Sequence, residues 1–445
     1  MHTLFPWVAQ AAHTPLTFVS GSGSWLTAED GRTYLDFSSQ LMVTNLGHQH
    51  PHVLAGIAAQ LQTLSFVQPS HLTPIREKLG ERLSRIASGM ADGAGDIGKV
   101  FLTTGGAEAI ENAIKMARMV TGRHKILTRY RAYHGATTGA LTLSGDARRH
   151  AISGSEMPGV IRVEDPYCYR CPWGQKFPTC DRLCISHIER IIEFEGPTSI
   201  AAIVMEGASG SSGCMTYPPD YWPALRRLAD AHGIVLISDE VMSGFCRTGS
   251  WFAVHQTGVQ PDMIVMAKGL TCGTVPMGAV WVSQPIADFF DEKPLQAGLT
   301  YSAHPLGCAA ALACLETYES EGINARVQYL GPLLQQQLKD GLVENPCVGD
   351  IRGAGFLQCI ELVKPGTQLP LFSRQMTAEE RAQQQRLSAA FLAEGLLVFM
   401  RLHYVFVAPP LTVSEGELTD GVGRLVRAMG SFLFEGSRLH GSPLQ

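Results

Sequence analysis

The sequence predicts an α/β protein with a large domain around a mostly parallel central sheet, flanked by helices, and a small α+β domain. Two short apolar runs, IVLISDEV (234–241) and DMIVMAKGL (262–270), are typical of strands that are buried on both faces. From residue 99 to about residue 325, such runs alternate with helical patterns, as in proteins with parallel sheets. With 445 residues the chain is too long for one compact core, so we expect two domains.

Both ends of the chain are expected to form the small domain. Residues 1–65 contain GSWLTAEDGRTYLDF (23–37), a hairpin pattern with its turn at Asp30-Gly31. Residues 326–445 would supply the C-terminal small domain, with two short strands around Arg401. Two of its helices begin with capping boxes, which pair a hydroxyl residue with a glutamate three positions later: Thr377 with Glu380, and Ser414 with Glu417.

Residues 66–325 are expected to form the large, ligand-binding domain. Within them, KVFLTT (99–104) predicts a strand, and PPDYWPALRRLADAHG (218–233) predicts a helix that ends at Gly233. This helix leads directly into the strand that carries Asp239, which is the helix-to-strand unit of a parallel sheet.

Composition and charge exclude several classes of protein. The net charge of −5 gives no general attraction to nucleic acid or to anionic membranes. No run of about 18 apolar residues occurs, so no spanning helix is expected. The N-terminus lacks the basic start and apolar stretch of a signal peptide, which favours a cytoplasmic protein.

Four of the eleven cysteines lie close together in the sequence, at Cys168, Cys171, Cys180 and Cys184. Their paired spacing is similar to that of a metal-binding knuckle. Only eight residues separate the two pairs, however, whereas zinc ribbons usually have about 15 or more. We therefore predict a surface loop of reduced thiols without a metal, with a zinc site as the alternative.

Each of the two apolar runs ends in one charged residue, Asp239 and Lys268. In open α/β sheets, ligands bind at the carboxyl ends of the strands, where these side chains would lie. A lysine held near a carboxylate in a dry crevice suits pyridoxal 5′-phosphate (PLP). Lys268 would form a covalent imine with the coenzyme, and Asp239 would keep its ring nitrogen protonated as an electron sink.

A third motif would hold the phosphate of this coenzyme. GGAEAIENAIKMAR (105–118) follows a strand and continues at helical spacing, which places Gly106 and Ala107 at a helix N-terminus that favours anions. Each signal alone has a plain alternative: a turn at the glycines, a solvated lysine at a strand end, or a helix start at Asp239. The order of the three motifs, with Lys268 29 positions after Asp239, favours the PLP interpretation.

The motifs in this order resemble those of the class III (ω-amino acid and amine) aminotransferases of PLP fold type I. The resemblance covers nearly the whole chain. It rests on six segments in the family's order: GGAEAIENAIKMAR (105–118), AYHG (132–135), EGASGSSGCMTYPPDY (206–221), SDEVMSGFCRTG (238–249), AKGLTCGTVPMGA (267–279) and GLTYSAHPLGCAAALA (298–313).

This resemblance implies roles for the residues around the coenzyme. Lys268 would bond the coenzyme and then carry the proton between substrate and cofactor, while Asp239 would pair with the pyridinium nitrogen. Tyr133 would stack on one face of the ring and Val241 would press on the other. Glu206 would lie beside the phenolic oxygen, although Gly207 follows it where the family usually has proline.

The resemblance also implies that two subunits share each active site. Thr300 would reach the phosphate of the neighbouring subunit, so we expect a homodimer, or two dimers paired into a tetramer. The alternative for Thr300 is a hydroxyl that satisfies a turn. Ala107 stands where many members have serine, which leaves the backbone N–H as the phosphate contact at that position.

Two further residues are expected to bind substrate. Arg401 occupies the place of an arginine that grips the carboxylate of the oxo-acid partner, and a guanidinium does so with two hydrogen bonds. An exposed hairpin arginine is the alternative. Met42 stands where several amine-active relatives have a large aromatic side chain.

The expected reaction is a ping-pong transamination. An ω-amino acid or amine would donate its amino group, and a 2-oxo acid would accept it, with pyruvate favoured over 2-oxoglutarate because one adaptable arginine can serve a small oxo acid. A PLP-dependent aminomutase or decarboxylase on the same scaffold is the alternative.

Overall fold

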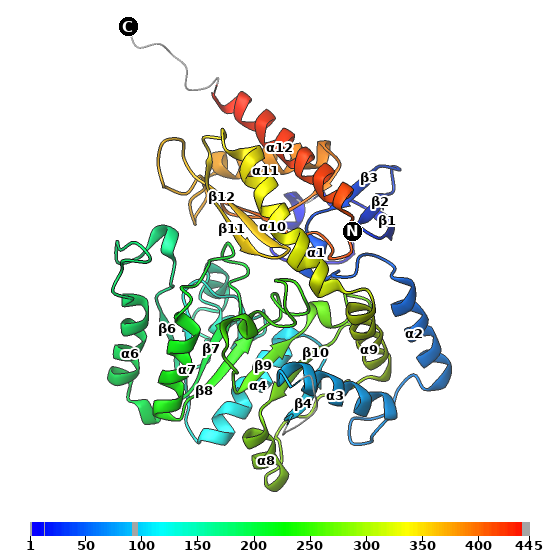
Figure 1. Ribbon diagram of the computed structural model, residues 1–445, viewed down its shortest axis with the longest axis vertical. Helices are drawn as coiled ribbons and strands as arrows, with labels where there is room; N and C mark the ends of the chain where they lie inside the picture. The colour runs from blue at the N-terminus through cyan, green and yellow to red at the C-terminus, as the bar shows by residue number, and fades with distance from the viewer. Residues whose placement is uncertain (1, 13, 91–96, 438–445) are drawn as a thin grey trace.

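The computed structural model describes residues 2–12, 14–90 and 97–437 (Figure 1). One part of the molecule surrounds a seven-stranded sheet, and the other contains two four-stranded sheets with the longest helices at its outer side (Figure 1). Among the described residues, no helix combines the length and the apolar character that crossing a membrane would need.

The seven-stranded sheet has the order β4-β10-β9-β8-β7-β5-β6. Its pairings are parallel except those of β10, which runs antiparallel to β4 and to β9. The predicted mostly parallel sheet is therefore confirmed. The strands are β4 (Lys99–Thr103), β5 (Lys125–Arg129), β6 (Val160–Val163), β7 (Ile200–Glu206), β8 (Val235–Asp239), β9 (Met263–Met266) and β10 (Gly278–Val282).

Alternate residues of the central strands point into two different cores. Ile203 and Leu236 belong to one apolar cluster, whereas their neighbours Val204 and Ile237 belong to another on the opposite face. This explains the continuous apolar runs in the sequence, because a strand covered on both faces has no solvent side. The covering helices are α3 (Pro74–Ala87), α4 (Gly106–Thr121), α5 (Thr138–Leu143), α6 (Leu183–Glu195), α7 (Tyr221–His232), α8 (Gln284–Glu292) and α9 (Pro305–Ser320).

The other part joins both ends of the chain, since β13 (Leu396–Leu397) pairs in parallel with β3 (Thr33–Asp36). The predicted hairpin is present, with β2 (Trp25–Ala28) antiparallel to β3. Both capping boxes are also present, at Thr377 and Ser414. The remaining elements are β1 (Phe18–Ser22), β11 (Val348–Ala354), β12 (Leu357–Leu362), β14 (Phe399–Arg401), β15 (Tyr404–Val407), α1 (Ser39–Met42), α2 (Pro51–Thr63), α10 (Ile323–Leu342), α11 (Ala378–Ala393) and α12 (Glu415–Ser437).

Candidate active site

Four parallel strands present charged side chains at the same edge of the central sheet. Arg129 ends β5, Glu206 ends β7, Asp239 ends β8, and Lys268 follows β9 by two residues. In the ladder of β7 and β8, Glu206 lies directly opposite Asp239. The backbone hydrogen bonds of the sheet therefore fix the spacing of these groups, independently of how their side chains pack.

A cavity of about 480 Å³ opens at this edge. Seven residues singled out from the sequence line it together: Gly106, Ala107, Tyr133, Glu206, Asp239, Val241 and Lys268. Three other predicted residues, Thr300, Arg401 and Met42, do not line this cavity.

The N-terminus of α4 forms one wall of the cavity, and the segments around it pack closely against its backbone. Gly105 precedes the helix without a side-chain cap, so the first N–H groups of α4 have no capping partner. A Cβ on Gly106 would lie 3.1 Å from both methyl groups of Val241. Gly135, at a φ of +145°, would bring its Cβ within 2.7 Å of the Ala107 Cβ. The glycines thus allow close packing around this helix N-terminus, and its uncapped N–H groups suit a phosphate group.

Asp239 is held at both of its carboxylate oxygens. Its Oδ2 accepts a hydrogen bond from His134 Nδ1 at 2.7 Å, and its Oδ1 accepts one from the Val241 N–H at 3.0 Å. The other ring nitrogen of His134 lies 3.3 Å from the Thr128 hydroxyl. We did not predict a role for His134, although it stands next to Tyr133 in the AYHG motif. The carboxylate is fixed where it can pair with a protonated ring nitrogen.

Lys268 begins a short 3-10 helix, Lys268–Leu270, in a left-handed conformation with φ of +43°. Burial lowers the pKa of its amine, while the nearby carboxylates of Asp239 and Glu206 oppose that shift. A lowered pKa leaves more of the amine unprotonated, which is the form that attacks a carbonyl carbon.

Glu206 forms an ion pair that the sequence did not reveal. Its Oε2 accepts a hydrogen bond from Arg129 Nη2 at 2.6 Å, and the other arm of Arg129 binds Asp165 at 2.9 Å. Burial raises the pKa of Glu206, and Arg129 counteracts this shift. Arg129 ends the short strand KILTR, in which only Ile126 and Leu127 are apolar, so its sequence signal is weaker than that of Asp239.

Gly207 stands where proline is usual in the resembling family, and the structure gives a steric reason for it. A Cβ at this position would lie 2.0 Å from a carboxylate oxygen of Glu240. The N–H of Gly207 also donates to the Asp239 carbonyl at 3.0 Å, a hydrogen bond that proline could not make.

Arg401 lies in a second cavity of about 410 Å³, which shares Ser211 with the first. Its Nη2 is 2.6 Å from Asp146 Oδ2. Arg148 binds the same carboxylate oxygen at 2.6 Å. The guanidinium of Arg148 also lies 3.7 Å from the centre of the Tyr133 ring. The sequence did not indicate Asp146 or Arg148, because neither stands at the end of a strand.

Thr300 and Met42 lie away from both cavities. Thr300 is exposed on the single chain. Met42 is 2% exposed and packs in a small apolar cluster with Cys214 and Tyr404, while its neighbour Val43 lines the first cavity.

The four clustered cysteines, Cys168, Cys171, Cys180 and Cys184, line one small hollow, and their thiols are free. Cys180 Sγ accepts a hydrogen bond from Arg182 at 2.9 Å. Within the described ranges, no group of three or more His, Cys, Asp or Glu side chains is arranged to hold a metal ion.

Comparison with known proteins identifies the family. The family model "Aminotransferase class-III" matches residues 8–429. A probable aminotransferase of Mycobacterium tuberculosis (strain ATCC 25618 / H37Rv) is 35% identical over 426 residues, which cover 92% of this chain and 88% of that protein.

Two solved structures are similar over nearly their whole length. The taurine:2-oxoglutarate aminotransferase of Bifidobacterium kashiwanohense, in complex with PLP and glutamate, has a TM-score of 0.90 and 35% identity, covering 97% of this chain and 95% of that chain. A thermostable (S)-enantioselective omega-transaminase of Thermomicrobium roseum also has a TM-score of 0.90, with 33% identity and coverages of 97% and 96%.

The chain therefore belongs to the class III aminotransferases. It has fold type I of the PLP-dependent enzymes, and it is a PLP-dependent transaminase that takes an amino group from an amine donor and gives it to a 2-oxo acid. The open helix N-terminus, the oriented Asp239 and the enclosed Lys268 fit this coenzyme.

Proposed function

We propose that the donor of this transaminase is an ω-amino acid, an amine with an acidic group at its far end, and that pyruvate is the preferred acceptor. The preference for pyruvate rests on Arg401 as one adaptable arginine that can serve a small oxo acid, and one observation carries the acidic donor. Two guanidinium groups, those of Arg148 and Arg401, share the single carboxylate of Asp146 in the cavity next to the coenzyme cavity.

The charges of this second cavity favour an acidic guest. Burial acts to raise the pKa of Asp146, but Arg148 and Arg401 hold it below its usual value, so Asp146 stays ionised. The two guanidinium groups of Arg148 and Arg401 thus face only one carboxylate, that of Asp146. Arg131 and Ser211 also line this cavity, and Arg131 Nη1 and the Ser211 hydroxyl are buried without a hydrogen-bond partner, with Arg131 Nη1 4.0 Å from Asp165 Oδ2. A carboxylate here would supply the missing charge and the missing acceptors.

In the first cavity, we propose that Gly106 and Ala107 hold the phosphate through backbone N–H groups. PLP, when bound, supplies an electron sink for the carbon that loses its proton. Asp239, fixed by His134, would hold a positive charge at the ring nitrogen. Lys268 would move the proton, because its amine is enclosed and its pKa is lowered.

Tyr133 and Val241 would enclose the two faces of the ring, and Glu206 would lie at its phenolic edge. Donor and acceptor would use the same Lys268, so they would bind one after the other, which is a ping-pong order. The acid group of each substrate would turn toward Arg401, and Met42 would act on the pocket indirectly, through its sequence neighbour Val43, which lines it.

We also propose a homodimer in which Thr300 completes the phosphate site of the partner subunit. Support comes from exposed apolar side chains near Thr300: Tyr301 is 60% exposed, and its ring lies 6.0 Å from that of Phe66, which is 39% exposed. Apolar rings left open to water favour burial against a second copy. Two such dimers could pair into a tetramer.

The proposed domain division is residues 1–65 and 326–445 for the small domain and 66–325 for the large one. The pairing of β13 with β3 supports a small domain made from both chain ends. The helix α2, which lies within residues 1–65, packs against α9 of the large domain and so links the two domains. We place the protein in the cytoplasm, since all eleven of its cysteines are free thiols.

The test uses two donors that differ only in the acid group. Purified protein with PLP is given 3-aminopropanoate or propylamine, with pyruvate or 2-oxoglutarate as acceptor, and alanine or glutamate is measured. The proposal expects the highest kcat/KM with 3-aminopropanoate and pyruvate. A preference for propylamine would contradict the donor class, and a preference for 2-oxoglutarate would contradict the acceptor.

A further inference from the structure

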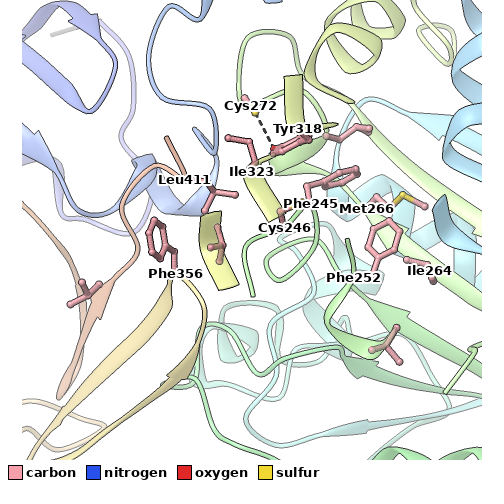
Figure 2. Packing of buried hydrophobic residues seen from close by; sticks show 14 of the residues in the cluster. Phe245, Cys246, Phe252, Ile264, Met266, Cys272, Tyr318, Ile323, Phe356 and Leu411 are labelled. Carbon is pink, nitrogen blue, oxygen red and sulfur yellow. Dashed lines mark hydrogen bonds between the residues drawn. The ribbon is translucent and has the colours of Figure 1, made fainter. Parts of the chain in front are cut away.

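The turn that follows Lys268 is held by a side chain from a distant helix. The carbonyl of Gly269 accepts a hydrogen bond from the Tyr318 hydroxyl at 2.7 Å. Tyr318 lies near the end of α9, 50 positions after Lys268 in the sequence. The Cys272 thiol lies 3.6 Å from the same carbonyl oxygen and 3.3 Å from the Tyr318 hydroxyl. Figure 2 shows the contact between Cys272 and Tyr318, with Phe245 close by.

The Cα of Gly269 is also closely packed by other atoms. A Cβ on this glycine would lie 2.4 Å from Asn45 Nδ2 and 3.0 Å from the Phe245 Cβ. Asn45 is itself fixed, because its Nδ2 donates to the Phe245 carbonyl at 3.0 Å. Gly269 is therefore held by a hydrogen bond at its carbonyl and by close packing at its Cα.

Tyr318 has little freedom to move away from this position. It is 1% exposed, its ring stacks on Phe245 with 6.1 Å between ring centres, and it meets Trp251 edge-on at 5.8 Å. An aromatic ring packed on two sides can orient its hydroxyl without losing further side-chain freedom.

The backbone beside the hydrogen bond is in a conformation that needs support. Lys268 has a φ of +43° and Cys272 has a φ of +52°, both in the left-handed region that side chains other than glycine rarely adopt. The Cys272 N–H donates to the Lys268 carbonyl at 3.0 Å, so the two strained residues close one turn. Such a turn persists only where its surroundings hold it.

We propose that Tyr318, assisted by Cys272, is a positioning residue that sets the direction of the Lys268 side chain through the Gly269 carbonyl. This inference rests on the proposed role of Lys268. Tyr318 touches neither of the two cavities, so its effect on the reaction would pass entirely through the turn.

The experiment compares Tyr318→Phe with Tyr34→Phe in the PLP-loaded protein. Tyr34 is an equally buried tyrosine, 1% exposed, on β3 of the other part of the molecule. Four quantities are measured: the visible absorbance of the bound coenzyme, the pH midpoint of that absorbance, the single-turnover rate with 3-aminopropanoate, and the steady-state KM for that donor.

With Tyr318→Phe, we expect a single-turnover rate about tenfold lower, since a small displacement of a reacting group is costly, and a moved pH midpoint. The KM for the donor should stay within about twofold, because the acid-binding cavity is unchanged. Tyr34→Phe should match the unchanged protein. Cys272→Ala should slow the reaction less than Tyr318→Phe, and Cys272→Ser, which keeps a donor, should restore the rate.

An unchanged pH midpoint and rate in a folded, PLP-loaded Tyr318→Phe protein would overturn the inference while leaving the proposed function intact. If the unchanged protein itself took up no PLP at Lys268, the proposed function would fail, and this inference would fail with it.

Discussion

The two neighbouring cavities are built from different kinds of structure. The first cavity, in which we place the coenzyme, lies at the ends of parallel strands, where Glu206 and Asp239 are directly opposite each other on β7 and β8. The second cavity is closed by loops and a hairpin, and its charged contact joins Asp146 to Arg401 across the two parts of the molecule. On the proposed assignment, the groups that handle the coenzyme are fixed by the sheet, whereas the groups that would bind the substrate's acid end lie on segments outside it.

The largest effect is expected at the sheet. Asp239→Asn keeps the shape of the side chain but removes the negative charge opposite the ring nitrogen. We expect kcat to fall by about 100- to 1000-fold with every donor, since a buried charge aimed at the reacting group contributes that much. Steady-state rates with 3-aminopropanoate and propylamine provide the measurement. A loss confined to the acid-ended donor would show that Asp239 acts on the donor's acid group and not on the coenzyme.

A second expected effect is on the pH dependence of stability, and it comes from the residue next to Asp239. Glu240, next to Asp239, is fully buried and accepts hydrogen bonds from the Ser243 hydroxyl at 2.5 Å and the Val254 N–H at 2.8 Å. Burial raises the pKa of Glu240 to about 7, against 4.5 for an ordinary glutamate. The folded protein thus holds this proton more tightly than the unfolded chain does. The resulting stability is fully present below about pH 4.5 and is lost as the pH rises through 7.

Glu240→Gln removes this titration. Between pH 4.5 and pH 8, the unfolding free energy of the unchanged protein should fall by about 3 kcal/mol relative to that of Glu240→Gln. Urea denaturation at several pH values measures the difference. Glu379→Gln, at the exposed start of α11, is the matched control and should show no such trend. Parallel pH profiles for Glu240→Gln and the unchanged protein would refute the prediction.

The smallest effect is expected in the second cavity, and it should be selective. Arg148→Met should lower kcat/KM for 3-aminopropanoate by about 10- to 100-fold, the range of a lost charge-assisted hydrogen bond, and leave propylamine nearly unaffected. Arg149→Met removes the same charge from the next residue, which donates to the Gly145 carbonyl and lies outside the cavity. Equal losses with both donors, or equal losses in both variants, would argue against an acid-binding role for Arg148.

The same contrast explains how much the sequence predicted. Asp239 and Lys268 could be found because each terminates an apolar run, and a parallel sheet brings strand ends to one edge whatever the rest of the chain does. The hairpin at Asp30-Gly31 and the capping boxes are likewise local patterns, and the structure confirms them.

Other contacts depend on distant segments and leave no local pattern. Asp146 caps a short 3-10 helix, Ala147–Ile152, which is all that its sequence neighbourhood indicates; its contact with Arg401 appears only once β14 is placed. The bond from Tyr318 to Gly269 is of the same kind, since it requires α9 to lie against the Lys268 turn. The position of Thr300 depends on a second chain and is therefore still a prediction.

Borohydride reduction shows which lysine bonds the coenzyme, because it converts the imine between them into a stable amine. The PLP-loaded protein is reduced, digested and mapped by mass spectrometry, beside a Lys268→Ala variant treated in the same way. We predict that the coenzyme is fixed to the peptide containing Lys268 and that the variant carries no fixed coenzyme. Attachment at any other lysine, or an equal label in Lys268→Ala, would show that Lys268 is not the residue that bonds PLP.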